Sequence, residues 1–191
     1  MKNIDYLVLI RGINAGSKNA IKMEKLKKIF ENMKFSNVET FIQTGNVFIK
    51  DYNNDKQKLS KKIEKNLSIE MKNEIKIKVL NINELNNIIK NVPEGFGGNN
   101  DKFKYDIMFL IEPLTTKEIM KELIILENED EIYEGKNVFY IKRSSKKLTG
   151  SYISQIANKW SNITVRNLKI TTELYELLLK RKTASKSKPL G

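Results

Sequence analysis

The first half of the chain alternates between strand-like and helix-like spacing of apolar residues. Residues 6–10 are apolar throughout, which predicts a strand covered on both faces. A spacing of three and four residues predicts helices around residues 26–33 and 59–67. Two β-rich runs, 38–42 and 47–49, flank a Gly-containing turn and predict a hairpin. The alternation at 75–79 predicts a strand with one solvent-facing side.

A second set of elements follows a short helical stretch near residues 85–92. Residues 93–100 are rich in Gly, Asn and Pro, and they lie at the midpoint of the chain. Beyond them, 106–111 matches 5–10, a helical pattern surrounds Ile119, and 137–139 matches 46–48. Apolar spacing then predicts helices at 153–160 and 174–178, the last capped by Thr171 or Thr172.

These elements predict an α+β fold. The order β-α-β-β-α-β in the first half is typical of a ferredoxin-like unit. We therefore expect two ferredoxin-like-related lobes, the second a pseudo-repeat of the first, with sheets covered by helices and with C-terminal helices. Chance similarity of short apolar strands is the alternative to a repeat. The expected boundaries are an N-terminal lobe at 1–92, a linker at 93–101, a C-terminal lobe at 102–182 and a disordered basic tail at 183–191.

The composition excludes several kinds of chemistry. The 191 residues include no Cys, which excludes disulfides, thiolate nucleophiles and cysteine-bound zinc. They include no His, which excludes a Ser-His-Asp triad and imidazole ligands. We expect neither a metal nor a cofactor. No apolar run approaches the ~20 residues of a membrane span, and the N-terminus lacks a signal-peptide pattern, so we expect a cytoplasmic protein without a membrane partner.

The net charge of +12 is unevenly distributed. Residues 136–191 carry 13 basic and two acidic side chains, whereas residues 101–135 carry four basic and ten acidic ones. Abundant Lys, Asn and Ile are typical of an A/T-rich genome, so many lysines are explained as solubilising surface residues. Arginine occurs only four times, which indicates positions where the planar guanidinium group and its bidentate pairing are needed. Arg181, in the basic tail, is expected to be an ordinary surface residue.

Two polar segments in the first half are candidates for ligand binding. One follows the first strand and contains Arg11, Asn14, Gly16 and Lys18. Its glycines allow close backbone approach, and a helix starting near residues 21–23 would favour an anion beside Arg11 and Lys18. The hairpin turn adds the polar side chains of Gln43, Thr44 and Asn46. The alternatives are turn formation alone and an Arg11–carboxylate pair.

Two further segments lie in the second half. Arg143 and Lys147 flank two serines in a predicted loop, where arginine, hydroxyl and N–H groups suit a phosphate. Arg166 and Asn167 precede the last predicted helix. The alternatives are a solvated basic loop for the first pair and a structural tie between helix and sheet for the second. We hypothesise that Arg11, Gln43, Arg143 and Arg166 line one common cleft.

The same segments carry a family resemblance. Residues 9–19 and 41–47, with Arg-Gly-Ile-Asn-Ala-Gly and Gln-Thr-Gly-Asn-Val, resemble the opening of the bacterial family catalogued as domain of unknown function 1697. Thr44 replaces a Ser, and Ser17 replaces a usual Gly. Residues 164–168 resemble a later family segment, but Leu168, Lys169 and Ile170 stand in place of Trp, Asn and Thr. The resemblance implies a two-lobed α+β fold and no particular activity.

Three functions are compatible with these features, and whether the protein is an enzyme stays open. The favoured one is a non-catalytic anion-binding module for a phosphate-bearing ligand or a nucleic acid. The second is a protein that binds or converts a carboxylate or phosphate metabolite through Arg11, Gln43 and Asn46. Its acid–base group would be Asp5, Glu24, Glu39 or a lysine. The third is a protein–protein adaptor whose polar motifs are structural.

Overall fold

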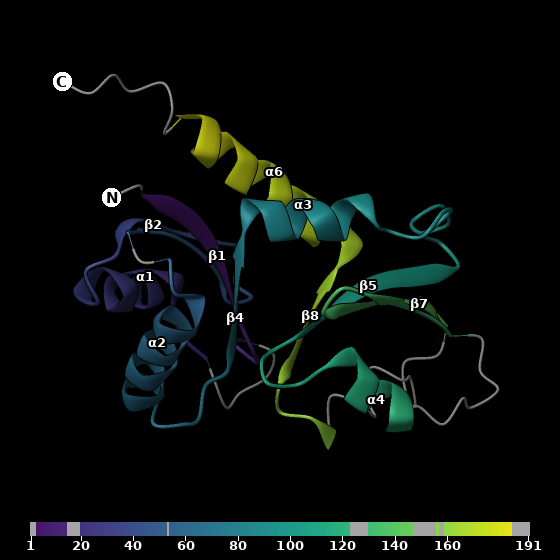
Figure 1. Ribbon diagram of the computed structural model, residues 1–191, viewed down its shortest axis with the longest axis horizontal. Helices are drawn as coiled ribbons and strands as arrows, with labels where there is room; N and C mark the ends of the chain where they lie inside the picture. The colour runs from purple at the N-terminus through teal and green to yellow at the C-terminus, as the bar shows by residue number, and fades with distance from the viewer. Residues whose placement is uncertain are drawn as a thin grey trace. The chain divides into compact units, whose positions relative to one another are not determined.

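A computed structural model of the protein describes residues 3–14, 20–52, 54–122, 130–146, 156 and 159–184. The predicted α+β fold is confirmed: the chain forms two four-stranded antiparallel sheets with helices (Figure 1). Its contacts define two compact units. Unit 1 comprises Met1–Leu85 and Glu173–Gly191, and unit 2 comprises Asn86–Thr172. No helix in the described ranges is both long enough and apolar enough to cross a membrane.

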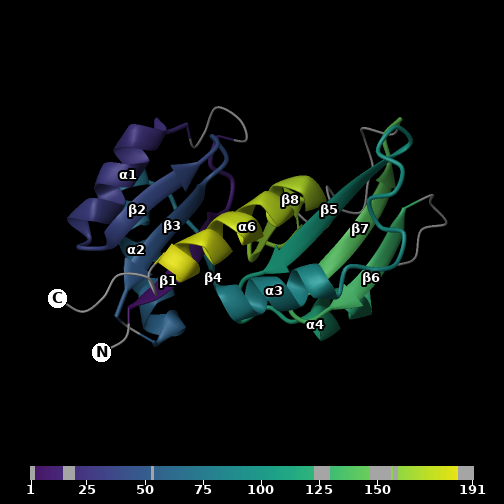
Figure 2. The same cartoon turned by 90° about the horizontal axis from the view of Figure 1, so that it is seen from above.

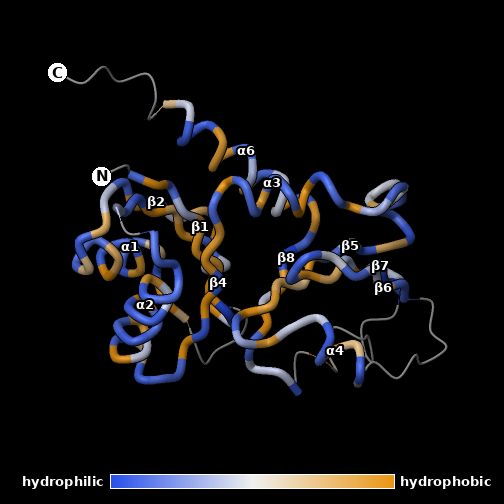
Figure 3. The backbone as a smooth tube through the Cα atoms, in the orientation of Figure 1, coloured by the Kyte–Doolittle hydropathy of each residue, from blue (hydrophilic) through white to orange (hydrophobic). Residues whose placement is uncertain are grey.

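Unit 1 contains the predicted β-α-β-β-α-β order. Its sheet has the strand order β2-β3-β1-β4. The elements of this unit are β1 (Ile4–Ile10), α1 (Met23–Asn32), β2 (Ser36–Phe41), β3 (Asn46–Asp51), α2 (Lys56–Met71) and β4 (Ile77–Asn81). The tube in Figure 3 is coloured hydrophobic along much of β1, as expected for the central strand of a covered sheet.

Helices α1 and α2 cover one face of this sheet. They lie side by side in Figures 1 and 2. The core beneath them contains Tyr6, Val8 and Ile10 of β1, which alternate along the strand, together with apolar residues of both helices. Burying this stripe is the main reason why the 3–4 spacing of α1 and α2 forms helices here.

The other face of the sheet is covered as well. Leu7, Leu9 and Phe48, on the face opposite Tyr6, are fully buried. The guanidinium of Arg181, in the long helix α6 (Leu168–Ala184), lies 5.4 Å from the centre of the Phe48 ring. The prediction that residues 75–79 expose one side is therefore wrong, because Lys78 on this face is only 4% exposed.

Unit 2 repeats the spatial order of unit 1. Its sheet has the order β6-β7-β5-β8, so each strand occupies the place of its counterpart in β2-β3-β1-β4. Its elements are β5 (Phe103–Leu110), α4 (Thr116–Glu122), β6 (Glu131–Gly135), β7 (Val138–Ser144) and β8 (Ile163–Asn167). α3 (Ile82–Lys90) leads into it from β4.

The unit boundaries differ from the expected ones. The division falls within α3, after Leu85, and the expected linker at 93–101 lies inside unit 2. Phe96 of that segment packs edge-on against the rings of Tyr105 and Tyr140, at centroid distances of 4.9 and 6.0 Å. The segment therefore packs against aromatic residues of unit 2, and it also connects helix α3 to strand β5.

The last helix differs from its prediction at both ends. It begins at Leu168, where the Asn167 Oδ1 accepts a hydrogen bond from the Ile170 N–H at 2.8 Å. Asn167 is thus the cap, whereas the Thr171 and Thr172 hydroxyls donate to carbonyls one turn earlier. The helix continues through Ala184, so residues 183 and 184 are helical rather than part of a disordered tail.

Arg181 holds the end of this helix on unit 1. Its Nη1 donates to the Glu39 carboxylate at 2.9 Å, and its Nε lies 3.4 Å from Asp5 Oδ1. A further hydrogen bond joins Nη2 to the Asn37 carbonyl. The Arg181 side chain is 12% exposed, and that of Asp5 is 6% exposed. Arg181 is therefore a largely buried ion-pair partner, and its expected role as an ordinary surface residue is wrong.

Removing this arginine is expected to destabilise unit 1. Arg181→Met leaves the buried Asp5 carboxylate without its arginine partner, so we expect a loss of about 3 kcal/mol in the free energy of unfolding, measured by urea denaturation. Lys180→Met, one residue away on an exposed position, is the control and should change stability by about 0.5 kcal/mol or less. Equal effects of the two substitutions would contradict this account of the helix end.

Candidate functional site

The two polar segments of the first half meet at one end of the sheet in unit 1. We call residues 11–14, after β1, and residues 42–45, between β2 and β3, the joined loops. The Ile10 N–H donates to the Gly45 carbonyl at 2.8 Å. The Asn14 Nδ2 donates to the Gln43 carbonyl at 2.9 Å. Hydrogen bonds therefore join two segments that lie about 30 residues apart in sequence.

Asn14 uses its whole carboxamide to hold this arrangement. Besides Gln43, its Nδ2 donates to the Ile21 carbonyl at 3.0 Å, and its Oδ1 accepts from the Ile21 N–H at 2.8 Å. The backbone of Asn14 has a φ of 55°, a left-handed conformation that asparagine tolerates better than most residues. Asn14 thus connects three segments: its own loop, the hairpin turn and the approach to α1.

Asn46 has a similar internal role. Its side chain is fully buried, and its Nδ2 donates to the Phe41 carbonyl at 3.2 Å and to the Thr44 Oγ1 at 3.0 Å. These bonds close the hairpin turn across its base. Asn46 is therefore a structural residue of the turn, and it is not presented to a ligand on the surface as the sequence hypothesis supposed.

Gly45 allows the loops to approach closely. It has a φ of 69°, and a Cβ at this position would lie 2.9 Å from the Ile13 Cβ and 3.1 Å from the Ile10 Cβ. Real Cβ atoms essentially never approach as closely as the first contact, and the second is tighter than nine in ten real Cβ contacts. Glycine is thus required here for two separate reasons, its backbone conformation and the space available.

Some residues of the joined loops other than these structural ones have side chains that reach the surface. Gln43 and Thr44 are exposed, and Arg11 is half-buried. Ile42 is 42% exposed and has a φ of 48°, which is rare for a β-branched residue. The sequence indicated no role for Ile42, because only Gly45 signals a left-handed residue in this turn. Gly16 and Lys18 lie outside the described residues.

In unit 2, Arg143 belongs to a strand. It lies in β7 opposite Lys104, and its Nε donates to Asp106 Oδ2 on the central strand at 2.7 Å. The prediction that Arg143 lies in a loop is wrong, because β7 continues to Ser144. Its guanidinium is already paired with a buried carboxylate. Lys147, its expected companion, lies outside the described residues.

Arg166 lies on the opposite face of the same sheet. It pairs with Ile107, whereas Arg143 pairs with Lys104, and side chains an odd number of positions apart on a strand point to opposite faces. Its Nη1 donates to the Thr164 Oγ1 at 3.0 Å and to the Val165 carbonyl at 2.7 Å. Burial lowers the pKa of the Arg166 guanidinium to about 10, so it remains charged at neutral pH. Arg143 and Arg166 therefore cannot line one cleft.

Two of the candidate acid–base residues already form ion pairs. Asp5 and Glu39 both pair with Arg181. Glu24 is exposed in the first turn of α1. Asp5 and Glu39 are thus held in ion pairs on the sheet face that α6 covers, and not among the joined loops.

Comparison with known protein families shows which family the chain belongs to. The model of a family described as "Protein of unknown function (DUF1697)" matches residues 4–140. The chain belongs to this family. One solved structure, the conserved bacterial protein SP0830 from Streptococcus pneumoniae, is similar with a TM-score of 0.78 and 23% sequence identity. That similarity covers 93% of this chain and 99% of the other, and it shows the shared fold. A search of curated proteins found no match.

The region matched by the DUF1697 model includes both segments of the joined loops and the whole sheet of unit 1. Arg143, Arg166 and Asn167 lie beyond its last matched residue. The joined loops are thus the part of the predicted site that belongs to the matched region of the family.

Two glycine substitutions test how tightly the joined loops pack. Gly45→Ala introduces both a strained φ and a steric clash, whereas Gly95→Ala introduces a similar strain, at a φ of 73°, with no atom within 4 Å of the new Cβ. We expect Gly45→Ala to lower the free energy of unfolding by about 1–3 kcal/mol more than Gly95→Ala, measured by urea denaturation. Equal losses would mean that the loops do not pack as described.

Proposed function

We propose that this member of the DUF1697 family is a non-catalytic anion-binding protein, and that the joined loops bind a small ligand carrying a phosphate or carboxylate group. The observation that carries the proposal is the Asn14–Gln43 hydrogen bond of 2.9 Å, because it joins the loop that contains Arg11 to the turn that contains Gln43 and Thr44. Arginine, amide and hydroxyl groups together suit an oxyanion.

Rigidity of the joined loops supports this proposal. Asn14 and Asn46 hold the backbone in place, and Gly45 leaves no space for the loops to shift toward each other. A surface that is ordered before binding loses less conformational entropy when the ligand arrives. The structural asparagines thus act indirectly, by positioning their neighbours.

Unit 2 provides an internal comparison. The Leu110 N–H donates to the Asn137 carbonyl at 3.1 Å, as Ile10 donates to Gly45 in unit 1. The residues after this strand are Ile111, Glu112, Pro113 and Leu114, without a cation or a glycine. This fold therefore joins a strand end to a hairpin turn without an Arg-Gly-Ile-Asn segment, which favours a ligand-related reason for Arg11. We further propose that the two units arose by duplication, which the shared strand order supports.

The placement of carboxylates supports binding without catalysis. Asp5 and Glu39 are engaged by Arg181, and no His or Cys is present in the chain. General acid–base catalysis needs a titratable group within reach of the reacting atoms. Binding by Arg11, Gln43 and Thr44 needs no such group.

A second candidate function is a protein–protein adaptor. It is favoured by Ile42, an exposed apolar side chain held in a left-handed conformation at the edge of the joined loops. Residues in such rare conformations cluster at functional sites. An adaptor would bury Ile42 against a partner protein, and Ile42→Ala would then weaken that complex.

Anion binding at the joined loops is testable by thermal unfolding. We expect inorganic phosphate, adenosine monophosphate or succinate, at about 100 times its Kd, to raise the melting temperature by about 5–10 °C. Arg11→Lys keeps the charge but loses the bidentate fork, so it should abolish most of this increase while leaving the ligand-free melting temperature nearly unchanged.

The control variant is Lys22→Gln, which removes an exposed cation beyond the joined loops and should keep the full increase. Stabilisation by one of the three anions that persists in Arg11→Lys and in Gln43→Ala would place the ligand elsewhere. Absence of stabilisation by all three would contradict the anion proposal.

A further inference from the structure

The outer helical layer of unit 1 carries a concentrated positive charge that the site above does not use. We define this layer as α1 and α2 with their flanks, residues 22–34 and 55–72. It contains eleven lysines and five carboxylates. Both helices bury their apolar stripe against the sheet, so their polar sides face outward.

Three lysines form a row along α2. Lys58, Lys61 and Lys65 are spaced by three and four residues, so they lie on one side of the helix, and all three are exposed. This side is opposite the buried stripe of Leu59, Ile63 and Leu67. The row spans roughly 10 Å, and Lys72 just beyond the helix extends it to roughly 21 Å.

The carboxylates of the layer lie beside this row and are mostly engaged. Glu64 Oε1 accepts a hydrogen bond from the Ile77 N–H at 3.0 Å, and Glu31 pairs with Lys27 at 3.8 Å. Asp55 caps the start of α2, and its carboxylate also lies 3.7 Å from Lys58. No carboxylate among the described residues lies within 4 Å of the Lys61 or Lys65 ammonium group.

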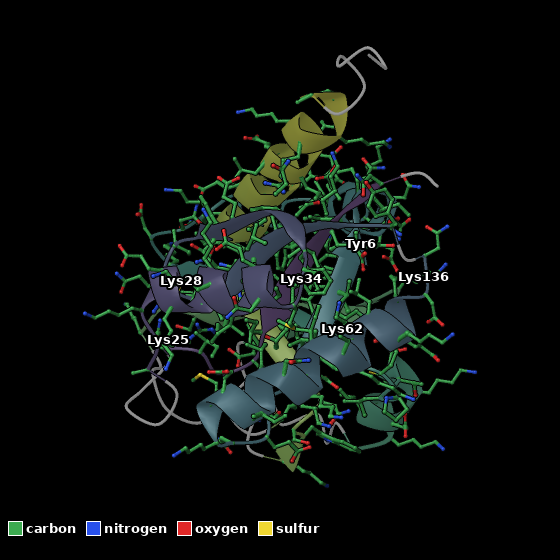
Figure 4. All side chains as sticks on the ribbon, turned by 90° about the vertical axis from the view of Figure 1, so that its left-hand side faces the viewer. Tyr6, Lys25, Lys28, Lys34, Lys62 and Lys136 are labelled. Atoms are coloured by element: carbon green, nitrogen blue, oxygen red, sulfur yellow. The ribbon has the colours of Figure 1, made fainter. Side chains whose placement is uncertain are left out.

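Helix α1 adds further cations to the same layer. Lys25 and Lys28 are exposed and, within the part of the chain that the structure describes, form no ion pair. Figure 4 views this layer and labels Lys25, Lys28, Lys34 and Lys62 on it. The Lys62 Nζ donates to the Met33 carbonyl at 2.8 Å and lies 4.5 Å from the Phe35 ring centre, so it ties α2 to the end of α1.

Like charges four residues apart, such as those of Lys61 and Lys65, do not stabilise a helix, so helix stability does not explain this pair. We infer that the α1–α2 layer binds the phosphodiester backbone of a nucleic acid without sequence preference. The row of ammonium groups is linear, as a phosphate backbone is, and lysine contacts phosphates as a point charge. The layer has no arginine, the residue that most often identifies bases through bidentate contacts.

An anionic membrane is the less favoured partner. A helix that lies on a membrane buries a broad apolar face in the lipid. Along the exposed side of α2 the large apolar residue is Ile69, at 65% exposure, and the apolar stripe is already buried against the sheet. This layer is distinct from the joined loops, so the two binding proposals stand on different residues.

Salt-dependent binding tests the inference. A fluorescently labelled 20-base-pair duplex of mixed sequence is titrated with the full chain at 50–300 mM KCl, with anisotropy as the signal. Neutralising four phosphates predicts a slope of about −3.6 in log K against log salt concentration. In K25Q/K28Q/K61Q/K65Q we expect at least tenfold weaker binding at 50 mM and a slope flatter by about 0.9 per lysine. The double variant K61Q/K65Q should show half of this change in slope.

The matched control removes the same net charge from unit 2. K102Q/K104Q/K117Q/K121Q replaces four exposed lysines there and should keep nearly the full affinity and slope. Arg11→Gln, which removes the charge of this side chain from the joined loops, should also bind the duplex normally, which separates this inference from the anion site. The inference is overturned if the native chain does not bind at 50 mM, if the two quadruple variants lose affinity equally, or if binding occurs only to vesicles containing phosphatidylserine.

Discussion

The carboxamide of Asn14 is the interaction on which the polar end of unit 1 depends. It forms three hydrogen bonds to backbone groups of two other segments, Ile21 and Gln43. Because these backbone groups lie outside helices and strands, the side chain satisfies polar groups that secondary structure leaves open. These bonds join the loop of Arg11 to the turn of Gln43 and Thr44. Asn14 in the joined loops and Asn46 next to them therefore have a structural role.

Charge in this protein is informative only once its position is known. The C-terminal part has the largest basic surplus, but Arg143, Arg166 and Arg181 are held by a carboxylate, a hydroxyl and carbonyl pair, and two carboxylates, respectively. Most lysines of the α1–α2 layer are exposed instead. Counting charges along the sequence thus identified a basic protein but did not show which of its cations are accessible.

Much of the fold follows from apolar spacing, since residues 6–10 and the helices α1 and α2 bury the stripes that their sequence contains. The meeting of the two polar segments was also predictable, because the last residues of a strand and the turn of a neighbouring hairpin lie at the same end of an antiparallel sheet. Other features depend on distant contacts. Arg181 pairs with Glu39, 142 residues away, and Lys78 is buried in a strand whose sequence pattern predicts one exposed face. The opposite orientation of Arg143 and Arg166 required the strand register.

Amide hydrogen exchange at Ile21 tests the role of Asn14 most directly. The Ile21 N–H precedes α1 and donates to the Asn14 Oδ1 at 2.8 Å, whereas the Leu26 N–H donates to the Lys22 carbonyl within the first helical turn. Asn14→Gly keeps the left-handed backbone accessible and removes the carboxamide. We predict that exchange at Ile21 becomes at least tenfold faster in this variant while Leu26 is little changed. Unchanged protection at Ile21 would contradict the view that Asn14 holds the joined loops together.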